Sequence, residues 1–320
     1  MIVRSFPRIH LGLLDMGYAT GRSYGGCGFT LSGPSTEIEA IRNSNSCVRG
    51  LSNVDEDGRQ DIAGAFLRLQ KRKPITAQLT IKKAPQQHIG LGTKTSLILS
   101  VLTSASLVSG ITISRQELQI LSQRGGASGV GINTFFFGGF IADAGHKCVS
   151  SYAPSSGRLP SEVPPIICRT SIPRTWRFDL LLPRGQYVSG GIEKGFFERN
   201  TPIARHEVLE AIALVYHGIV PAVLSNDFDL LKHSVNQLMD IGFKKREFQA
   251  QTEQVKSVIR YLKRLDNCVV GLSSLGPLIF IVTAQRHPSF SDKLARVCEE
   301  TDSMYLGCFR GRNRGYEVVE

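Results

Sequence analysis

The sequence predicts an α+β protein with two domains. Strand-like and helical segments follow one another along all 320 residues, a length that suits two ordinary domains. Residues 154–173 are rich in proline and serine, and the periodicity of the apolar residues changes beyond them. We therefore place a boundary near residue 165, with an N-terminal domain over 1–165 and a C-terminal domain over 166–320.

The composition is typical of a globular enzyme, because 42% of the residues are hydrophobic and 20% are charged. The N-terminus carries Arg and Pro inside its apolar part, unlike a secretory signal. The apolar helix expected from about Ser96 is too short to span a bilayer. Seven cysteines include no C-x-x-C pair, which predicts reduced, mostly buried thiols. We expect a cytoplasmic protein with no membrane partner.

The net charge of +11 would suit nucleic acid, a membrane surface or anionic small substrates. The basic residues are scattered, and their densest groups lie at 71–73, 244–247 and 310–314. No aromatic residues are interleaved with a basic stripe, so we predict no nucleic-acid partner. A cleft that concentrates polyphosphate explains the charge as well or better.

In the first half, Ile62, Phe66 and Leu69 stand at helical spacing and predict a helix over 59–73. Ser114 is the expected N-cap of a shorter helix. The strands expected here are the opening segment with a bend at Pro7, the segment after the glycine-rich turn "RSYGG", and "STEIEAI", "ITAQLTIKKAP" and "NTFFFGGFIADAGH".

In the second half, "WRFDLLLP" reads as a strand, and helical stretches follow near 204–218, 226–241 and 249–265. "CVVGLSSLGPLIFIVT" predicts two strands joined by a loop of small residues. The segment from 289 to 310 predicts a helix followed by a strand. No internal repeat or low-complexity tract interrupts this order.

Three loops of small residues are the strongest functional signal. The first runs from Gly90 to Ser96 as G-L-G-T-K-T-S, where glycines let backbone N–H groups approach an anion. Its hydroxyls and Lys94 add donors and charge, although it does not match the Walker A pattern. The second loop, 124–131, places small residues beside Arg124, and the third spans 271–276. Each alone would pass for an ordinary turn, but together, in a basic chain, they favour a polyphosphate site.

The order of these loops resembles the GHMP kinase superfamily, whose P-[KR]-x-x-L motif is matched by Pro7-Arg8-Ile9-His10-Leu11. Within it, the segments "RIHLGLLDM", "GLGTKTSL", "RGGASGVGINTFFFGGFIADAGH", "GGIEKGFF" and "GLSSLGPLIF" resemble the β-ribofuranosylaminobenzene 5'-phosphate synthases. C-nucleoside synthases of the formycin and pyrazofurin type are close relatives of that family. The resemblance extends over nearly the whole chain and implies a two-domain GHMP kinase fold, with an N-terminal ribosomal-S5-domain-2-like part and a C-terminal ferredoxin-like part.

One position separates a synthase from a kinase. Several GHMP kinases carry S-G-V-D-N, whose Asp is the base on the acceptor hydroxyl, whereas this chain has Gly131 at that position. Glycine cannot accept a proton, and a kinase that relies on this base would lose about two to four orders of magnitude in rate. Some superfamily kinases lack the base, so an ATP-dependent kinase stays open as the alternative, together with a non-catalytic anion-binding protein.

The resemblance implies a reaction between 5-phosphoribosyl 1-diphosphate (PRPP) and a ring carbon of an aromatic carboxylate. Carbon dioxide and pyrophosphate are released, Mg²⁺ assists the diphosphate, and the enzyme serves methanopterin or antibiotic biosynthesis. The loop G-L-G-T-K-T-S departs from the common G-L-G-S-G-T-Q at Lys94, which leaves the acceptor open between 4-aminobenzoate and a pyrazole-type acid. The resemblance also implies a homodimer, as is common in that family.

The same resemblance gives the candidate site residues. The catalytic candidates are His10, Asp15, His146 and Glu193. The candidates for the PRPP phosphates are Arg8, Gly90, Gly92, Thr93, Lys94, Thr95, Ser96, Arg124, Gly125, Gly126, Ser128, Gly129, Ser273, Ser274 and Gly276. The acceptor candidates are Tyr24, Gly25 and Gly26, and the Mg²⁺ candidate is Asp143. The other histidines singled out, at 217, 233 and 287, are expected on the surface or on helices.

Overall fold

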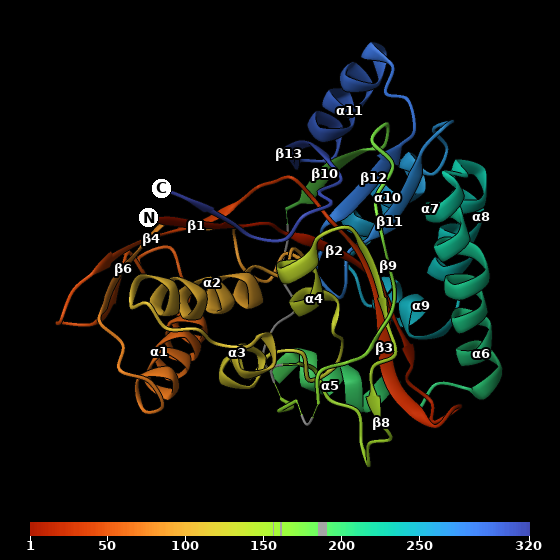
Figure 1. The fold of residues 1–320 in the computed structure, drawn as a ribbon. Helices are drawn as coiled ribbons and strands as arrows, with labels where there is room; N and C mark the ends of the chain where they lie inside the picture. The colour runs from red at the N-terminus through yellow and green to blue at the C-terminus, as the bar shows by residue number, and fades with distance from the viewer. Residues whose placement is uncertain (156, 161, 185–190) are drawn as a thin grey trace.

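The computed structural model describes residues 1–155, 157–160, 162–184 and 191–320. Its strands form three sheets, and helices cover their faces (Figure 1). The N- and C-termini lie side by side, because the last strand pairs with the first. The expected α+β class is confirmed.

The first sheet has the order β14-β1-β4-β6-β5 and packs against α1 and α2. Alternation in "STEIEAI" and "AQLTIKK" places Ile38 and Leu79 in the core, opposite Leu97 of α2. The strands are β1 (Ile2–Ser5), β4 (Thr36–Arg42), β5 (Cys47–Arg49), β6 (Ala77–Lys83) and β14 (Glu317–Val319). The helices are α1 (Glu56–Gln70), α2 (Thr93–Val108) and α3 (Arg115–Ser122).

The second sheet has the order β2-β3-β7-β9, with β8 paired to β3, and it connects the other two sheets. Its buried side chains, such as Phe29 and Phe140, pack against Trp176 and Phe178 of the third sheet and its approach. Its elements are β2 (Arg8–Asp15), β3 (Arg22–Thr30), α4 (Val130–Phe137), β7 (Phe140–Asp143), β8 (His146–Lys147) and β9 (Ile166–Thr170).

The third sheet has the order β11-β12-β10-β13 and is buried on both faces by helices. The strands are β10 (Arg177–Pro183), β11 (Val269–Leu272), β12 (Ile279–Thr283) and β13 (Ser303–Arg310). The helices after β10 are α5 (Gly191–Asn200), α6 (Arg205–Ala213), the π-helical turn η1 (Leu214–Ile219), α7 (Val220–Ser225), α8 (Phe228–Met239), α9 (Gly242–Gln249), α10 (Glu253–Leu262) and α11 (Pro288–Glu300).

The continuous helical stretch Arg205–Ser225 is long and apolar enough to cross a membrane by length and composition alone. In the structure its buried side chains, including Val215 and Ile219, belong to the largest core cluster together with β10 and β12. Figure 1 shows the stretch alongside α8, and the two pack against each other. It is therefore placed as a core helix of a folded domain.

Most expected elements are confirmed, including the cap at Ser114, whose side chain accepts from the backbone N–H of Glu117. The expectation of a strand through "NTFFF" was wrong, because residues 130–137 form α4. Phe135–Phe137 favour a strand by propensity, but the Ser128 hydroxyl accepts the Val130 N–H at the start of the helix. Gly138 then ends the helix with φ 61°.

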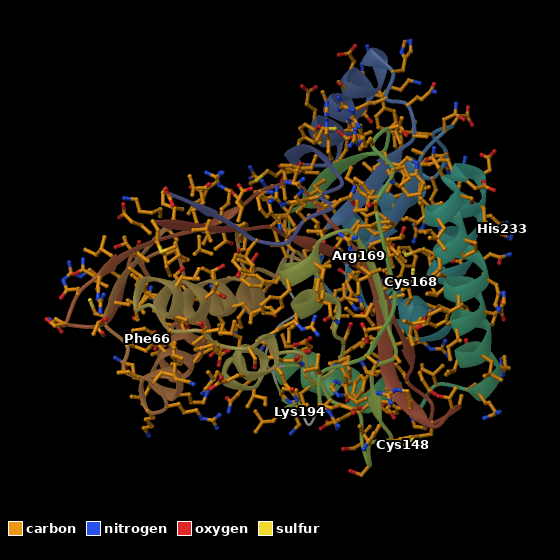
Figure 2. The ribbon with its side chains drawn as sticks, viewed as in Figure 1. Phe66, Cys148, Cys168, Arg169, Lys194 and His233 are labelled. Carbon is orange, nitrogen blue, oxygen red and sulfur yellow. The ribbon has the colours of Figure 1, made fainter. Side chains whose placement is uncertain are left out.

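The cysteines and the domain boundary give two further results. All seven cysteines are free, but only Cys27 and Cys268 are buried, so the expectation of mostly buried thiols was wrong. Cys148 is exposed beside β8 (Figure 2). Strand pairing crosses the boundary expected near residue 165, since β9 pairs with β7 and β14 with β1. The two-domain division stays a prediction.

Candidate active site

A cleft with two connected lobes lies where the three small-residue loops meet. The glycine lobe, about 130 Å³, is bordered by Gly90, Gly92 and Lys94. The histidine lobe, about 150 Å³, is bordered by His10 and Gly131. The lobes are continuous because they share lining residues from separate parts of the chain, namely Arg8, Thr95, Arg124, Ser155, Glu193, Ser274 and Leu275.

Hydrogen bonds of Ser273 hold the third loop against the first. Its hydroxyl donates to the carbonyl of Gly90 at 2.7 Å and accepts the backbone N–H of His10 at 3.0 Å. Gly90 has φ 109°, and a Cβ there would lie 2.5 Å from the Ser273 carbonyl, so only glycine fits. Gly276 is equally close to the backbone of Ile89. Ser273 therefore holds the loops together and has no hydroxyl hydrogen left for a ligand.

The N-terminus of α2 faces the glycine lobe. Gly92 is its N-cap, with φ 73° and no side-chain cap, so the first N–H groups of the helix are available to an anion. The hydroxyl of Thr93 donates to Gln86, and the Lys94 ammonium pairs with Asp61 at 3.1 Å. Ser96 does not border either lobe, because its hydroxyl bonds to Ser5 in the core.

Two guanidinium groups stand at the junction of the lobes. Arg8 donates to the Gly90 carbonyl at 2.6 Å, and its buried Nε has no hydrogen-bond partner within the described residues. Burial and the neighbouring Arg124 lower the pKa of Arg8 to about 10. Arg124 donates to the Thr95 hydroxyl at 3.2 Å, and burial lowers its pKa. Neither guanidinium forms an ion pair with a described carboxylate, so the pair is suited to a polyanion.

A hydrogen-bonded chain joins His10, Ser128 and Asp143. The His10 Nε2 lies 3.1 Å from the Ser128 hydroxyl, which donates to the Asp143 carboxylate at 3.1 Å. Burial raises the pKa of Asp143 to about 6, although several donors oppose this shift. Burial, with smaller contributions from Arg8 and Lys244, holds the pKa of His10 well below its usual value.

The hydrogen bonds to Asp143 limit the roles that its carboxylate can have. The carboxylate is fully buried, borders neither lobe, and also accepts the backbone N–H of Gly145 at 2.9 Å. Within the described residues, no group of three or more His, Cys, Asp or Glu side chains is arranged to hold a metal. These donors occupy the Asp143 carboxylate, and its Mg²⁺ role stays a prediction.

The remaining glycines of the second loop shape the backbone. A Cβ on Gly126 would lie 2.1 Å from the carbonyl of Arg158, and one on Gly129 would lie 2.8 Å from Pro164. Gly125 has φ 90° and borders the histidine lobe. Its carbonyl bonds to the Nε2 of His146 at 2.7 Å. His146 is buried behind the loop and lines neither lobe, so it supports the loop from behind.

Asp15 and the first acceptor candidates lie outside the cleft. The Asp15 carboxylate accepts from the backbone of Ala19 and the hydroxyl of Thr20, which closes the β2–β3 turn. Asp15, Tyr24 and Gly25 border a separate, mostly apolar cavity of about 420 Å³. Gly26 borders neither lobe, and a Cβ there would lie 2.8 Å from the His10 Nε2.

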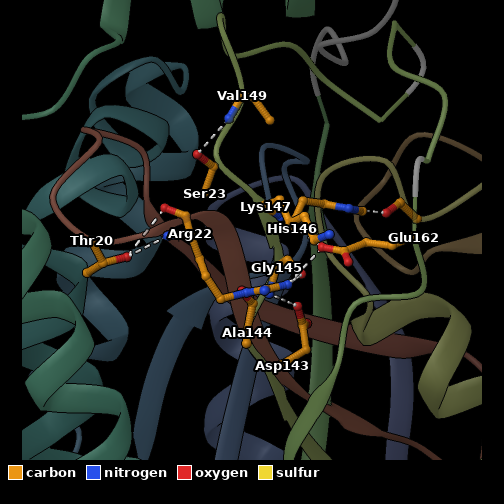
Figure 3. A network of polar contacts seen from close by, with 11 residues as sticks. Thr20, Arg22, Ser23, Asp143, Ala144, Gly145, His146, Lys147, Val149 and Glu162 are labelled. Atoms are coloured by element: carbon orange, nitrogen blue, oxygen red, sulfur yellow. Dashed lines mark hydrogen bonds and ion pairs between the residues drawn. The ribbon is translucent and has the colours of Figure 1, made fainter.

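A polar network around Arg22 fixes this side of the sheet (Figure 3). Arg22 donates to the carbonyls of Ala144 and Gly145 and pairs with Glu162 at 2.9 Å. The Glu162 carboxylate also accepts the backbone N–H of Lys147. These bonds hold the end of β7, which carries Asp143. They thereby position Asp143 behind Ser128 and His10.

The sequence prediction missed a buried ion pair at the cleft. The sequence analysis noted residues 244–247 only as one of the densest basic groups, but Lys244 and Glu247 are buried and their charged atoms lie 2.7 Å apart. Lys244 also donates to the Leu272 carbonyl at 2.8 Å, and Glu247 borders the histidine lobe. Their i, i+3 spacing was the available signal. Glu193, on α5, borders both lobes.

Solved structures share this fold at low sequence identity. Homoserine kinase from Cytophaga hutchinsonii superposes with a TM-score of 0.68 at 16% identity, covering 99% of this chain and 97% of that one. Phosphomevalonate kinase from Streptococcus pneumoniae gives 0.69 at 13% identity, covering 97% and 99%. The expected GHMP kinase fold is confirmed by these matches.

Curated relatives are more similar in sequence. The β-ribofuranosylphenol 5'-phosphate synthase of Methanothermobacter thermautotrophicus is 28% identical over 329 residues, covering 100% of this chain and 99% of the relative. That of Methanocaldococcus jannaschii is 30% identical over 294 residues, covering 88% of each. No family model matches the chain. The similarity over most or all of each chain shows that this chain belongs to the β-ribofuranosylphenol 5'-phosphate synthase family.

Proposed function

We propose that this enzyme transfers the ribosyl 5-phosphate of PRPP to a ring carbon of an aromatic carboxylate, with release of carbon dioxide and pyrophosphate. Membership of the synthase family supports the reaction class. The observation that carries the proposal is the pair Arg8 and Arg124, two half-buried side chains that form no ion pair among the described residues, beside the open N-terminus of α2. Such a site needs a multiply charged anion.

The two lobes suit the two halves of this reaction. The bond between the anomeric carbon and the diphosphate breaks with oxocarbenium character, so the leaving diphosphate must be stabilised as it departs. The glycine lobe supplies backbone N–H groups, and Lys94 borders it. The histidine lobe is next to it and would hold the acceptor ring on the opposite face of the ribose.

Magnesium belongs to the same proposal. Mg²⁺ usually keeps several waters and binds through one or two carboxylates together with substrate phosphates. Glu193 fits this pattern because it borders both lobes. When bound, the ion would neutralise charge on the departing diphosphate.

A kinase activity is less well supported. The likeness to homoserine and phosphomevalonate kinases lies at 16% identity or below and concerns the fold. Gly131 borders the histidine lobe and supplies no carboxylate there. Glu247 borders the same lobe, but its charge is paired with Lys244.

The finer assignments rest on the relatives. The name of these relatives describes a ribosylated phenol as the product. This favours a hydroxybenzoate-type acceptor over the 4-aminobenzoate and pyrazole-type acids expected from the sequence. A homodimer, a cytoplasmic location and a role in antibiotic biosynthesis stay predictions.

The test uses the purified chain with PRPP, Mg²⁺ and carboxyl-labelled 4-hydroxybenzoate or 4-aminobenzoate. We expect equal amounts of labelled carbon dioxide and pyrophosphate, and a product with a β carbon–carbon bond between ribose and ring. PRPP with Mg²⁺ should also raise the melting temperature more than ATP does. Pyrophosphate release with the label retained, or a thermal shift with ATP alone, would contradict the proposal.

A further inference from the structure

We propose that His10 is the general base that takes the hydroxyl proton of a phenolic acceptor through its Nδ1, with Ser128 and Asp143 as positioning residues behind it. The inference rests on the proposed function and deepens it, because it predicts which acceptors depend on His10. It follows from the direction of the hydrogen bonds behind the ring and from the position of the ring in the histidine lobe.

The hydrogen bonds select one tautomer of His10. The ionised Asp143 carboxylate can only accept, so the single hydroxyl hydrogen of Ser128 is given to it. The Ser128 oxygen already accepts the Val130 N–H and can accept again. The His10 Nε2 must therefore carry the hydrogen that points at Ser128. This leaves Nδ1 with a lone pair and no hydrogen.

Within the described residues, the Nδ1 of His10 has nothing to accept a hydrogen bond from. His10 is 4% exposed, and its Nδ1 is buried with no hydrogen-bond partner among the described residues. A buried acceptor left unpaired costs about 1–3 kcal/mol, so it calls for a donor from a ligand. The His10 ring borders the histidine lobe, next to Arg8 and Gly131. A phenol hydroxyl held in this lobe would supply the missing donor once a small shift of the ring or its neighbours uncovers Nδ1.

The proton balance suits a base that acts twice. As the ring carbon that bears the carboxylate bonds to the anomeric carbon, the carbon–oxygen bond to diphosphate breaks and its electron pair leaves with diphosphate. The phenol proton passes to Nδ1, and the ring becomes a cyclohexadienone. Carbon dioxide then leaves, its bonding pair restores the aromatic ring, and the phenolate oxygen takes the proton back from Nδ1. No external acid, base or oxidant is required.

An amine acceptor needs this base far less. A ring amine donates its nitrogen lone pair and keeps both hydrogens until carbon dioxide leaves. A neutral phenol is the weaker donor, and it becomes strong only as its proton departs. The two acceptor types therefore place different demands on His10.

The surrounding charges are consistent with a base that is neutral before substrate binds. Arg8 and Lys244 face His10 and disfavour the imidazolium, whereas Glu247 is paired with Lys244, and Asp143 acts through Ser128. Diphosphate bound at Arg8 would offset the nearest positive charge. The basicity of Nδ1 would then rise when PRPP is in place.

The experiment compares wild type with His10→Gln, whose side-chain amide can still donate to Ser128 but has no basic nitrogen. Both are assayed with PRPP, Mg²⁺ and a series of 4-hydroxybenzoates made more acidic by ring fluorination, and with 4-aminobenzoate. We expect kcat with 4-hydroxybenzoate to fall about 10²–10⁴-fold in His10→Gln. The loss should shrink below about tenfold for acceptors already ionised at the assay pH and for the amine. PRPP affinity should change less than about threefold, because Arg8 and the glycine lobe are intact.

Two further variants keep the result interpretable. Ser128→Ala leaves the imidazole in place but removes its tether, so we expect a smaller loss with the same dependence on acceptor acidity. His233→Gln is the matched control, because His233 is exposed on α8 (Figure 2). An equal loss with every acceptor, or no loss, would overturn the role of His10. Absence of PRPP-dependent carbon dioxide and pyrophosphate release from wild type with any acceptor would instead reject the proposed function itself.

Discussion

Placing a carboxylate at position 131 should block PRPP without harming the fold. A Cβ on Gly131 would lie 3.6 Å from Thr95 and 4.0 Å from the Nε of Arg8, which are ordinary contacts, and its φ is not in the left-handed region. In Gly131→Asp, the carboxylate could therefore reach the unpartnered Arg8 Nε. From the histidine lobe, which Gly131 borders, it would compete with diphosphate for Arg8 at the junction of the two lobes.

The expected loss has two parts. PRPP would lose a charge-assisted contact with Arg8, worth about 1.5–3 kcal/mol. It would also meet a like charge at roughly 4–8 Å, which costs about 2–4 kcal/mol at an effective dielectric constant of 20. Together these weaken PRPP binding by about 10²–10⁵-fold. The melting temperature of the free protein should not fall, because the new carboxylate pairs with Arg8 near the N-terminus of α4.

Isothermal titration of PRPP with Mg²⁺ measures this effect. Gly131→Asn is the matched control, since it has the same size without the charge, and Gly131→Ala tests size alone. PRPP affinity that is equal in the Asp and Asn variants would refute the reasoning, because diphosphate would then lie elsewhere.

Three other predictions use the same cleft. Arg124→Ala should weaken PRPP binding by about 1.5–3 kcal/mol with an unchanged melting temperature, whereas the exposed Lys82→Ala should leave the affinity unchanged in the same titration. Glu247→Gln should destabilise the fold by about 3–5 kcal/mol in urea unfolding, because it leaves Lys244 buried without its partner, and the double replacement Lys244→Met with Glu247→Leu should recover most of that loss. The pKa of Asp143 rises from 3.8 to about 6 on folding, so its protonated form stabilises the fold below pH 4 and that stability is lost as the pH rises through 6. Asp143→Asn should therefore gain about 3 kcal/mol relative to wild type between pH 4 and pH 7 in urea unfolding, and parallel curves would contradict this.

Local patterns in the sequence were sufficient for much of the fold and for half of the cleft. The Ser114 cap, the alternating strands and the glycine-rich loops depend on neighbouring residues, which a single sequence displays. Lys94 and Arg124 were found because they stand in those loops, and Arg8 because it stands in the motif Pro7–Leu11. These features need no knowledge of what lies across the molecule.

The rest depends on contacts between distant parts of the chain. His10 and Ser128 are 118 positions apart. The pairing of β3 with β2 and β7 brings His10 of β2 near Asp143 of β7, and Ser128, in the loop before α4, bonds to both. In the sequence, Lys244 stands out only as one member of a basic group, whereas burial against β2 and β11 determines its role. The phenylalanines of α4 favour a strand, but they form a helix that has Gly129 at its N-cap and Gly138 at its C-cap. In the sequence these caps are visible only as glycines.

The charge pattern of the cleft also explains why this fold can serve glycosyl transfer. A kinase base at position 131 would be an anion beside Arg8, and it would compete with the leaving diphosphate for the same guanidinium. With Gly131 in that position, Arg8 stays available to the diphosphate. The proposed base, His10, is neutral and comes from β2, and the negative charge behind it, on Asp143, is buried one hydroxyl away from the ring. A neutral base with a shielded carboxylate can act beside a polyanion, because it adds no repulsion before the proton moves.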